Sequence, residues 1–336
     1  MADRFHRLRV AAVVEETADA RSLVFEVPSE LADRFRHRPG QFLTLRIPGE
    51  RGEIARSYSL CNGPGEPLTV TVKRVADGYG SNWLCDRVSA GMELDVLPPA
   101  GVFTPDSLDD DLLLFAGGSG ITPVIAIVKA VLANGSGRLT LFYANRDEHS
   151  VIFAAELRAL CAAHPDRLQV VHWLESVQGL PTVPALRAFA APLSARRVFL
   201  CGPGPFMTAV VEALSTVDIP EDRIHREVFL SLSDNPFAAT PEADVDAAVV
   251  EVDLDGEQHT LPWPRQRKLL DVLLDHGLAA PYSCREGACS ACACRLVDGK
   301  VTLAHNEVLD EEDLAEGIIL ACQALPAADS VRISYQ

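Results

Sequence analysis

The sequence predicts a multidomain protein in which an antiparallel β-barrel is followed by a doubly wound α/β parallel sheet and then by a small α+β unit. Three observations predict this order. Residues 5–105 read as short alternating strands, residues 111–232 alternate strands with helices, and the last ninety or so residues surround a group of cysteines. At 336 residues the chain is also too long for one ordinary hydrophobic core.

The barrel is expected over residues 1–108. Six short runs of apolar and β-branched residues are separated by turn signals such as Pro39-Gly40 and Asn62-Gly63. Many short strands with regular turns are typical of a small barrel or sandwich. The runs are LRVAAVV, RSLVFEV, QFLTLRI, RSYSL, LTVTVKRV and MELDVLP.

The doubly wound sheet is expected over residues 109–232. The apolar run LLLFA (112–116) reads as a buried strand, and PVIAIVKAVL (123–132) has helical spacing. Three more strand and helix pairs and a final strand follow in the same alternation, which predicts a parallel sheet covered by helices. Their strands are RLTLFYA, LQVVHWL, RVFLCG and RIHREVFL.

The C-terminal part is expected to be a linker, 233–246, followed by a compact domain, 247–336. The linker sequence SDNPFAATPEADVD is rich in Pro, Ala and acids and has no periodicity. The domain has strand patterns near 247–254 and 258–261, a helix near 267–276, and a cysteine loop. A unit this small gains stability from a metal centre.

The composition is acidic, with 47 Asp and Glu against 30 Lys and Arg and a formal net charge of -17. A surface of that sign repels nucleic acid and anionic membranes, and it suits a protein partner with a basic face. Acidity that merely keeps the protein in solution is the alternative. We expect a monomer that binds small molecules and a partner protein, with no nucleic acid and no membrane.

The N-terminal sequence MADRFHRLRV lacks the apolar stretch of a secretory signal, so a cytoplasmic protein is expected. The uncharged stretch 112–128 is shorter than a bilayer span, and three glycines and a proline interrupt it. Nine cysteines in a cytoplasmic protein indicate metal or redox chemistry rather than disulfides.

The cysteine loop predicts an iron–sulfur cluster. Cys284, Cys289 and Cys292 have the spacing C-x4-C-x2-C, and Cys322 follows thirty residues later. This is the plant-type [2Fe–2S] ligand pattern. Small residues between the ligands let backbone N–H groups turn toward the cluster's sulfurs, and Gly287 can adopt the positive φ that such a wrap needs.

There are three alternatives to this ligand set, and the first is that four structural cysteines are buried together by chance. A structural zinc site usually has two C-x2-C-like knuckles, which this loop lacks. Cys294 offers an alternative third ligand, but alternation along a strand turns it away from Cys292, so it is assigned as a non-ligand. The segment from Tyr282 to Cys294, with the sequence Ala-Cys-Gln around Cys322, resembles a plant-type ferredoxin domain, which has a β-grasp fold.

A glycine-rich turn lies between the first strand and the first helix of the predicted parallel sheet. Gly117, Gly118 and Gly120 are followed by Ile-Thr-Pro, with Thr122 and Pro123 opening the helix. Glycines there let backbone amides approach a pyrophosphate at the helix N-terminus. The sequence GGSGITP resembles the corresponding turn in the nicotinamide domain of the ferredoxin-NADP reductase superfamily. The resemblance implies that Thr122 lies near a flavin.

The sequence Cys201-Gly202-Pro203 at the end of a later strand resembles the same superfamily. The resemblance implies that Cys201 lies beside C4 of the nicotinamide. A small buried residue that simply ends a strand is the alternative. After the second strand, Arg146 could pair with a 2′-phosphate, whereas Asp147 or Glu148 could bind a free ribose hydroxyl and repel a phosphate. Two acids beside one base favour NADH, with NADPH possible.

The flavin is expected on the barrel. Arg56, Ser57, Tyr58 and Ser59 resemble the superfamily's R-x-Y-S motif, in which the arginine contacts the pyrophosphate, the tyrosine packs on the isoalloxazine and the serine approaches N5. A fixed cation suits a diphosphate on physical grounds too. About twenty residues later comes a sequence that resembles the second phosphate motif of members that bind FAD rather than FMN. Its cofactor-binding candidates are Gly80, Ser81, Asn82 and Trp83.

Three further residues complete the expected sites. Lys73 lies between the two flavin motifs and could reach the cofactor, although a solvated strand face is the commoner role of such a lysine. Glu227 and Phe229 resemble the family's closing E-x-aromatic, which covers the flavin's nicotinamide face. The expected catalytic residues are therefore Ser59, Cys201 and Glu227.

The resemblance covers essentially the whole chain in the order flavin, nicotinamide, ferredoxin, and it is strongest to reductase components of bacterial multicomponent oxygenases. It implies that electrons pass from NAD(P)H to FAD, to the [2Fe–2S] cluster and on to a terminal iron-containing oxygenase. From residue 247 onward the chain has 15 acids against 7 bases, with four consecutive acids at 310–313. We expect this acidic face to steer docking of the partner.

Overall fold

The computed structural model describes residues 5–49, 52–237 and 246–335. The chain forms two compact units. The larger consists of Phe5–Pro99 with Phe103–Phe229, and the smaller is formed mainly by Leu230–Gln336. In the described ranges, no helix has the length and apolarity needed to cross a bilayer.

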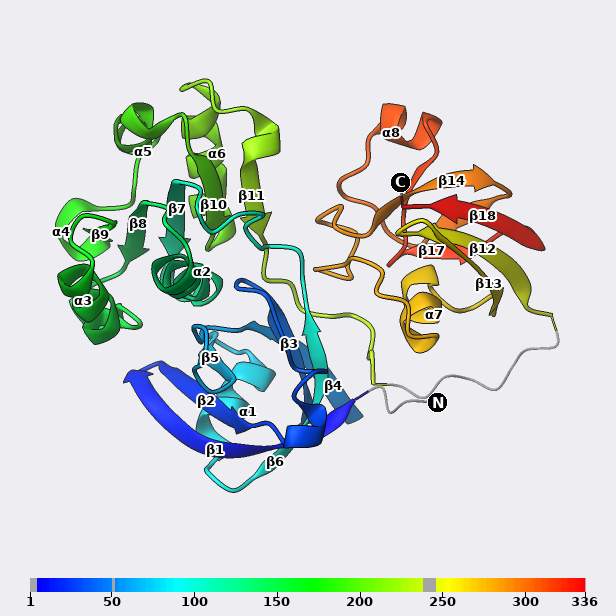
Figure 1. Ribbon diagram of the computed structural model, residues 1–336, viewed down its shortest axis with the longest axis horizontal. Helices are drawn as coiled ribbons and strands as arrows, with labels where there is room; N and C mark the ends of the chain where they lie inside the picture. The colour runs from blue at the N-terminus through cyan, green and yellow to red at the C-terminus, as the bar shows by residue number, and fades with distance from the viewer. Residues whose placement is uncertain (1–4, 50–51, 238–245, 336) are drawn as a thin grey trace. The chain divides into compact units, whose positions relative to one another are not determined.

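The first half of the larger unit is a six-stranded antiparallel barrel (Figure 1). The strand order is β4-β3-β6-β1-β2-β5, and a bridge from Leu60 to Val70 joins the chain after β4 to β5, which brings the two edges together. Alternate side chains point inward and form one core around Leu8, Leu45 and Val72. The strands are β1 (His6–Thr17), β2 (Ala20–Glu26), β3 (Phe42–Gly49), β4 (Gly52–Ser59), β5 (Thr69–Lys73) and β6 (Glu93–Ala100), with one short 3-10 turn (Ser29–Leu31) and one helix, α1 (Tyr79–Arg87).

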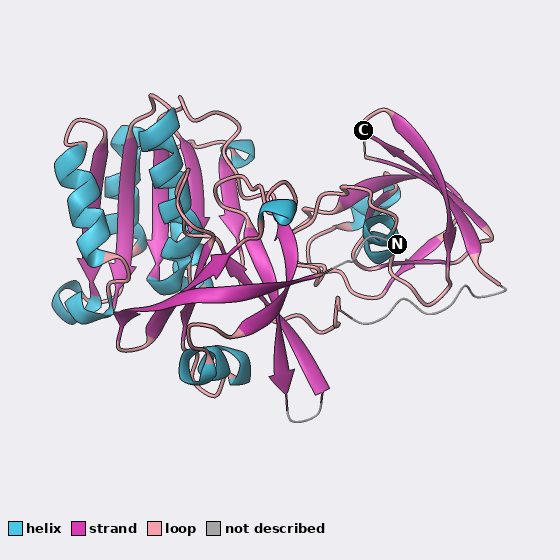
Figure 2. Cartoon of the chain, turned by 60° about the horizontal axis from the view of Figure 1, so that its bottom comes forward, coloured by secondary structure: helices cyan, strands magenta, loops and turns pink. Residues whose placement is uncertain are grey.

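The second half of the larger unit is a five-stranded parallel sheet in the order β11-β10-β7-β8-β9. Helices lie on both faces of this sheet (Figure 2). Its strands are β7 (Leu112–Gly117), β8 (Leu139–Asn145), β9 (Leu168–Leu174), β10 (Arg197–Cys201) and β11 (Ile224–Glu227). Its helices are α2 (Ile121–Asn134), α3 (Ala154–Ala163), α4 (Glu175–Gln178), α5 (Val183–Ala190) and α6 (Gly204–Ser215), with 3-10 turns at Gly118–Gly120, Glu148–Ser150, Ala191–Leu193 and Glu221–Arg223.

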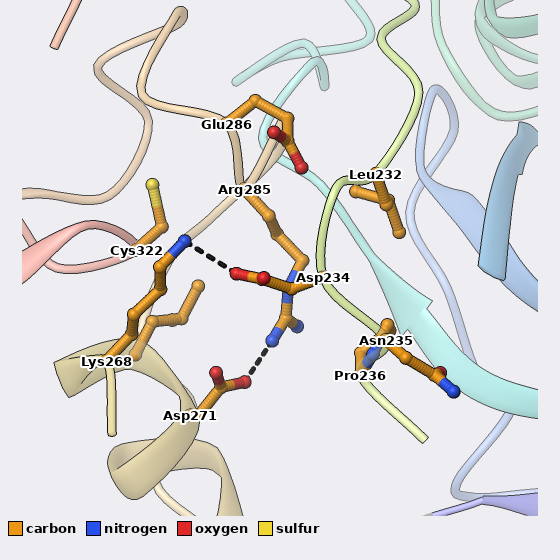
Figure 3. A pocket seen from close by; sticks show the side chains of 10 residues that line it. Leu232, Asp234, Asn235, Pro236, Lys268, Asp271, Arg285, Glu286 and Cys322 are labelled. Atoms are coloured by element: carbon orange, nitrogen blue, oxygen red, sulfur yellow. Dashed lines mark hydrogen bonds and ion pairs between the residues drawn. The ribbon is translucent and has the colours of Figure 1, made fainter. Parts of the chain in front are cut away.

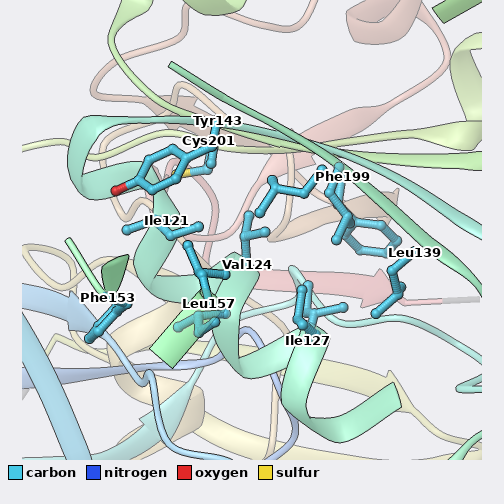
Figure 4. Packing of buried hydrophobic residues seen from close by; sticks show 14 of the residues in the cluster. Ile121, Val124, Ile127, Leu139, Tyr143, Phe153, Leu157, Phe199 and Cys201 are labelled. Atoms are coloured by element: carbon cyan, nitrogen blue, oxygen red, sulfur yellow. The ribbon is translucent and has the colours of Figure 1, made fainter. Parts of the chain in front are cut away.

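The central strand β7 is apolar at every position because both of its faces are covered. Leu112 and Leu114 pack with α2 and α3, whereas Leu113 and Phe115 pack with α5 and α6. Figure 4 shows the first of these cores, in which Ile121 and Val124 of α2 lie among side chains from the sheet and from α3. The uncharged stretch 112–128 is therefore a buried strand, a turn and a buried helix, as the sequence predicts.

The smaller unit is a five-stranded sheet in the order β13-β12-β18-β14-β16. The first and last strands of the unit, β12 and β18, pair in parallel, while the other neighbours are antiparallel. Its core includes Leu269, Leu270 and Leu273 of the helix α7. A mixed sheet around one helix is the expected β-grasp. The elements are β12 (Ala248–Leu254), β13 (Glu257–Trp263), α7 (Leu269–Asp275), β14 (Ala293–Asp298), β15 (Val301–Leu303), α8 (Glu311–Ala315), β16 (Ile318–Leu320), β17 (Ala324–Pro326) and β18 (Ser330–Ser334).

The fold class predicted from the sequence is thus confirmed for all three parts. The expected linker, 233–246, is only partly visible, because 238–245 lie outside the described residues. Its first residues, together with Leu230–Leu232, belong to the smaller unit rather than to the sheet that precedes them.

Candidate flavin, nicotinamide and iron–sulfur sites

Two turns meet at the carboxyl ends of the adjacent parallel strands β7 and β10. A Cβ added to Gly120 would lie 2.1 Å from the carbonyl oxygen of Cys201, and one on Gly117 would lie 2.8 Å from Cδ of Pro203. A Cβ on Gly202 would in turn lie 3.0 Å from the backbone nitrogen of Gly117. A side chain at Gly120 would clash with the backbone, and one at Gly117 or Gly202 would force the neighbouring turn to shift. The structure therefore brings the two motifs of the predicted nicotinamide site together, at the point where the strand order reverses and ligands of such sheets bind.

The glycine-rich turn leads directly into a long buried helix, α2. Gly118 has a positive φ of 52°, and its carbonyl oxygen accepts a hydrogen bond of 3.2 Å from the hydroxyl of Tyr143. The hydroxyl of Thr122 donates to the carbonyl oxygen of Ser119 at 3.0 Å, and Pro123 is buried beside it. The turn is thus fixed with the first backbone amides of the helix at the sheet edge, where the helix dipole favours an anion.

Cys201 and Glu227 lie opposite one another on β10 and β11. Both are buried, at 0% and 7% exposure. Burial raises the pKa of the Cys201 thiol well above its ordinary value, and the nearby Glu227 carboxylate raises it further. The thiol is consequently a neutral group at the edge where the nicotinamide is expected. The assignment of both residues as catalytic remains a prediction.

On the barrel, the predicted flavin motif occupies the end of β4. A Cβ on Gly80, at the start of α1, would lie 3.2 Å from Cγ of Arg56, so the helix start and the arginine are in contact. Ser57 shares a 3.0 Å hydrogen bond with Thr44, and Ser59 is buried. A cation beside a helix N-terminus is a suitable environment for the diphosphate of a flavin nucleotide.

The side chains that follow Gly80 make hydrogen bonds and packing contacts within the barrel. The hydroxyl of Ser81 accepts from the backbone N–H of Val75 at 3.1 Å, and the amide of Asn82 donates to the carbonyl oxygens of Val75 and Gly78 at 3.1 and 2.9 Å. Trp83 packs against the barrel core. Their predicted contact with the cofactor stays a prediction, and in this arrangement they hold the turn that precedes α1.

Lys73 lies at the junction of the barrel and the parallel sheet. Its amino group is 3.5 Å from the position that a Cβ on Gly118 would occupy, and 3.9 Å from the carboxylate of Asp19. The same carboxylate pairs with Arg146 at 2.8 Å. Burial lowers the pKa of Lys73, which Asp19 partly offsets. Sequence reasoning missed Asp19, because nothing in the strand pattern separates this aspartate from a solvated turn residue.

The acids expected to set coenzyme preference have different surroundings. Asp147 accepts from the backbone N–H of Ser150 at 2.9 Å and so caps a short helical turn. Glu148 is exposed beside His149. The carboxylate that faces Arg146 is therefore Asp19.

Beyond β11, Phe229 exposes 47% of its surface and is accessible for stacking on a planar group.

The four predicted cluster ligands come together in two pairs. The backbone N–H of Cys284 donates to the sulfur of Cys289 at 3.4 Å, and that of Cys322 donates to the sulfur of Cys292 at 3.5 Å. Within the described part of the chain, no three His, Cys, Asp or Glu side chains are grouped as ligands of a single ion. Two cysteines per iron, completed by bridging sulfides, is the arrangement that a [2Fe–2S] cluster requires.

Backbone amides of the loop already point at the ligand sulfurs. The N–H groups of Glu286 and Ala288 donate to the sulfur of Cys284 at 3.3 and 3.4 Å. The neighbouring Cys289 thiol, together with these N–H donors, lowers the pKa of Cys284 despite its burial. Gly287 has the expected positive φ, at 76°. A loop that stabilises thiolate sulfur in this way fits an iron–sulfur centre.

Two residues next to the ligands differ in how well the sequence predicts their role. Cys294 was assigned as a non-ligand, and Arg285 was not singled out. Cys294 lies in the core with its thiol toward Tyr335, and burial raises its pKa to about 12. Arg285 was missed. It adopts a positive φ of 60°, its guanidinium pairs with Asp271, and it lies 5.1 Å from the centre of the Tyr282 ring. Its position directly after a ligand was the available signal.

Comparisons with known proteins find a matching domain for each of the three regions that carry these candidate sites. Residues 7–104 match the oxidoreductase FAD-binding domain, 114–212 match the oxidoreductase NAD-binding domain, and 252–327 match the 2Fe-2S iron-sulfur cluster binding domain. The phthalate dioxygenase reductase structure is similar with a TM-score of 0.59 and 25% identity, covering 99% of this chain and 98% of that one.

Curated relatives align over nearly the full length. The chain is 58% identical to the 3-ketosteroid-9-alpha-monooxygenase ferredoxin reductase component of Rhodococcus rhodochrous, covering 98% of this chain and 96% of that protein. Identity to the component of the same description from Mycobacterium tuberculosis is 54%, covering 100% and 97%. A 1,2-phenylacetyl-CoA epoxidase chain from Escherichia coli is 34% identical, covering 98% of each protein.

The matching regions make the chain an oxidoreductase that uses NADH, FAD and a [2Fe–2S] cluster. Two segments, VFLSLSDNPF and PYSCREGACSACACRL, on their own predict a resemblance to the reductase of 3-ketosteroid 9α-hydroxylase. The reductase of phenylacetyl-CoA epoxidase is the next most similar by these segments, and reductases of aromatic-ring Rieske dioxygenases are a further alternative. Identity above one half along the whole chain confirms the first resemblance. The chain belongs to the family of ferredoxin reductase components of multicomponent monooxygenases, in which NADH, FAD and a [2Fe–2S] cluster form one electron-transfer route.

Proposed function

We propose that this chain supplies electrons to the terminal oxygenase of a system that hydroxylates 3-ketosteroids at the 9α position. The observation that carries the proposal is the 58% identity to a reductase component of that system, which extends through all three cofactor regions. The substrate class rests on the relatives alone, because a reductase does not touch the organic substrate.

The residues of this chain hold and separate the reacting groups. We infer that the amides at the start of α2 bind the coenzyme pyrophosphate and that the neutral Cys201 thiol packs beside the nicotinamide. Arg56 and the start of α1 bind the flavin diphosphate, and Ser59 approaches the flavin ring. When bound, the flavin accepts a hydride from NADH and the cluster accepts single electrons from the flavin.

The four cysteines and the N–H groups of their loop hold the cluster in the smaller unit. Donors aimed at the sulfurs stabilise the added negative charge of a reduced cluster. The chain's contribution is thus binding, orientation and electrostatics, while the cofactors supply the redox chemistry.

We also propose that the acidic segment Asp310–Asp313 guides docking of the oxygenase. The segment begins α8, where the Asp310 carboxylate accepts from the backbone N–H groups of Glu312 and Asp313, both at 2.9 Å. Replacing all four acids would therefore also remove a helix cap. Glu311→Gln with Glu312→Gln neutralises charge and leaves that cap in place.

This docking proposal predicts slower reduction of the oxygenase by the double glutamine variant at low ionic strength. It also predicts that the difference shrinks as salt rises, because salt screens exposed charges. The rate of ferricyanide reduction by NADH serves as the control for an intact flavin site. A partner reduction rate that depends on neither the substitutions nor the salt would rule out this role for α8.

The function itself is tested by reconstitution. The purified reductase is combined with terminal oxygenases of three kinds, a 3-ketosteroid 9α-hydroxylase, a phenylacetyl-CoA epoxidase and an aromatic-ring Rieske dioxygenase. NADH-coupled product formation is measured for each. We expect coupled turnover with the steroid hydroxylase. Coupled turnover with another oxygenase, together with none with any steroid hydroxylase, would contradict the proposal.

A further inference from the structure

The segment Leu230–Phe237, here called the strap, packs on the cysteine loop of the smaller unit. From residue 233 onward its sequence has no periodicity and reads as linker, yet Pro236 and Phe237 are buried. Figure 3 shows a small pocket between the strap and the loop, lined by Leu232 and Asp234 on one side and by Glu286 and the ligand Cys322 on the other. The strap is therefore a neighbour of the cluster site.

Two polar contacts fix the strap in place. The backbone N–H of Ser233 donates to Oε1 of Glu286 at 2.7 Å, and the Ser233 hydroxyl donates to Oε2 of the same carboxylate at 2.8 Å. One residue later, the carboxylate of Asp234 pairs with Lys268 at 2.6 Å. Both bonds from Ser233 are exposed to solvent, and their value is that a two-point contact fixes the orientation of the carboxylate.

Glu286 connects the strap to a cluster ligand. Its side chain accepts both bonds from Ser233, while its own backbone N–H donates to the sulfur of Cys284 at 3.3 Å. Holding the side chain of Glu286 limits the movement of that N–H. Groups that orient such a donor influence the retention and the reduction potential of an iron–sulfur cluster.

We propose that Ser233 is a positioning residue for the [2Fe–2S] cluster, acting through Glu286 on the hydrogen bond to the Cys284 sulfur. The chain that leads into the smaller unit would then set the properties of the cluster it carries. The proposal rests on the cluster assignment and not on the identity of the oxygenase, so the steroid proposal could fail while this one stands.

The expected direction of the change in midpoint potential follows from the negative charge on the cluster sulfurs. Reduction adds negative charge to the cluster, and an N–H donor aimed at a ligand sulfur stabilises the reduced form. Loosening that donor should make the midpoint potential more negative. It should also give a chelator easier access to the ligands, because Leu232 and Asp234 of the strap line the same small pocket as Cys322.

The test compares Ser233→Ala with Ser231→Ala in the full-length holoprotein. Ser233→Ala removes the hydroxyl bond to Glu286, and Ser231 lies two residues away on the same strap and is exposed as Ser233 is. Two quantities are measured, the midpoint potential by EPR-monitored titration and the rate of cluster loss to an iron chelator. For Ser233→Ala we expect a more negative midpoint potential and cluster loss on the order of tenfold faster. Tenfold is the lower end of the loss in metal affinity that follows removal of a residue hydrogen-bonded to a metal ligand.

Two further variants separate positioning from a general effect on folding. Ser233→Thr keeps the hydroxyl and should restore both quantities. In a Glu286→Ala background, Ser233→Ala should add nothing further, because its route to the ligand is already gone. If Ser233→Ala loses its cluster during purification, Glu286→Gln, which keeps one acceptor oxygen, replaces it. Faster cluster loss is then the expected result, and only that quantity is compared because removal of the carboxylate charge itself shifts the potential.

Three results would overturn the proposal. The first is a Ser233→Ala protein that matches Ser231→Ala in both potential and cluster loss. The second is failure of Ser233→Thr to restore them. The third is an effect of Ser233→Ala that persists undiminished in the Glu286→Ala background, which would show that Ser233 acts by another route.

Discussion

At the scale of single residues, Asp19 links the barrel to the coenzyme side of the parallel sheet. Its carboxylate lies 2.8 Å from Arg146 and 3.9 Å from Lys73. We expect both cations to attract the 2′-phosphate of NADPH when their charge is not neutralised. Neutralisation by Asp19 is therefore expected to favour NADH, although Asp19 lies outside the turn that follows the second strand of the parallel sheet.

Asp19→Asn is expected to raise kcat/KM for NADPH relative to NADH by up to about fivefold. The limit follows from the worth of a partly exposed ion pair, about 1 kcal/mol or less. Steady-state reduction of ferricyanide with each coenzyme measures the ratio. Asp95→Asn, at a barrel carboxylate that pairs with Arg7 and Arg46, is the matched control and should leave it unchanged. An unaltered ratio in Asp19→Asn would refute this account of coenzyme choice.

Cys61 provides a test of how the stability of the folded protein depends on pH through a single buried thiol. Burial raises the pKa of its thiol from about 9 to about 12, an effect that the Thr71 hydroxyl only partly offsets. Above pH 9 the unfolded chain ionises this thiol while the folded protein does not. Stability is therefore complete below that pH and falls as the pH rises, by at most about 1.4 kcal/mol per pH unit for this group.

Cys61→Ser should accordingly lose less thermal stability between pH 8 and pH 10 than the wild type. Thermal release of the flavin, followed by its fluorescence, reports the stability of the larger unit. Cys161→Ser, at a less buried thiol, is the control and should retain most of the wild-type pH dependence. Equal losses in the wild type and Cys61→Ser would count against the buried-thiol explanation.

At the scale of elements, the two turns after β7 and β10 function only as a packed pair. Gly120→Ala would place a Cβ 2.1 Å from the Cys201 carbonyl oxygen, which is a backbone atom that cannot move aside easily. We expect destabilisation of about 1–3 kcal/mol from overpacking. We also expect a loss in kcat/KM for NADH of about a hundredfold, since misplacement by about 1 Å can cost that much.

Gly204→Ala is the matched control for this substitution. It lies at the start of α6, close to the same turn, and an added Cβ would meet nothing within 4 Å. Thermal stability and the NADH–ferricyanide activity of the two variants are compared. Gly120→Ala with wild-type activity and stability would mean that the two turns are not the coenzyme site described above.

The sequence predicted those elements whose signal is local. Cys284 and its partners are recognisable by spacing, and Gly117 and Gly120 by their place between a strand and a helix. The contacts between distant segments could not be predicted in this way. Ser233 reads as linker because its partner, Glu286, is 53 residues away, and Asp19 is 127 residues from Arg146. Pairings of that kind depend on the assembled fold and leave no periodic pattern.

At the scale of the whole molecule, the chain combines a hydride acceptor with a one-electron carrier. The barrel and the parallel sheet form one compact unit that holds the flavin and nicotinamide sites, and the cluster ligands lie in the other. NADH delivers two electrons together, whereas a [2Fe–2S] cluster accepts one. A fixed order of reduction, flavin first and cluster second, is the central claim for this architecture.

Anaerobic stopped-flow reduction with one equivalent of NADH tests that order most directly. The flavin absorbance and the cluster's charge-transfer bands are followed together, with EPR of the quenched samples. We expect the flavin to bleach first and the cluster signal to rise afterwards. A Cys284→Ser protein should keep the flavin phase and lose the cluster phase. Reduction of the cluster before the flavin, or bleaching of neither by NADH, would contradict the account.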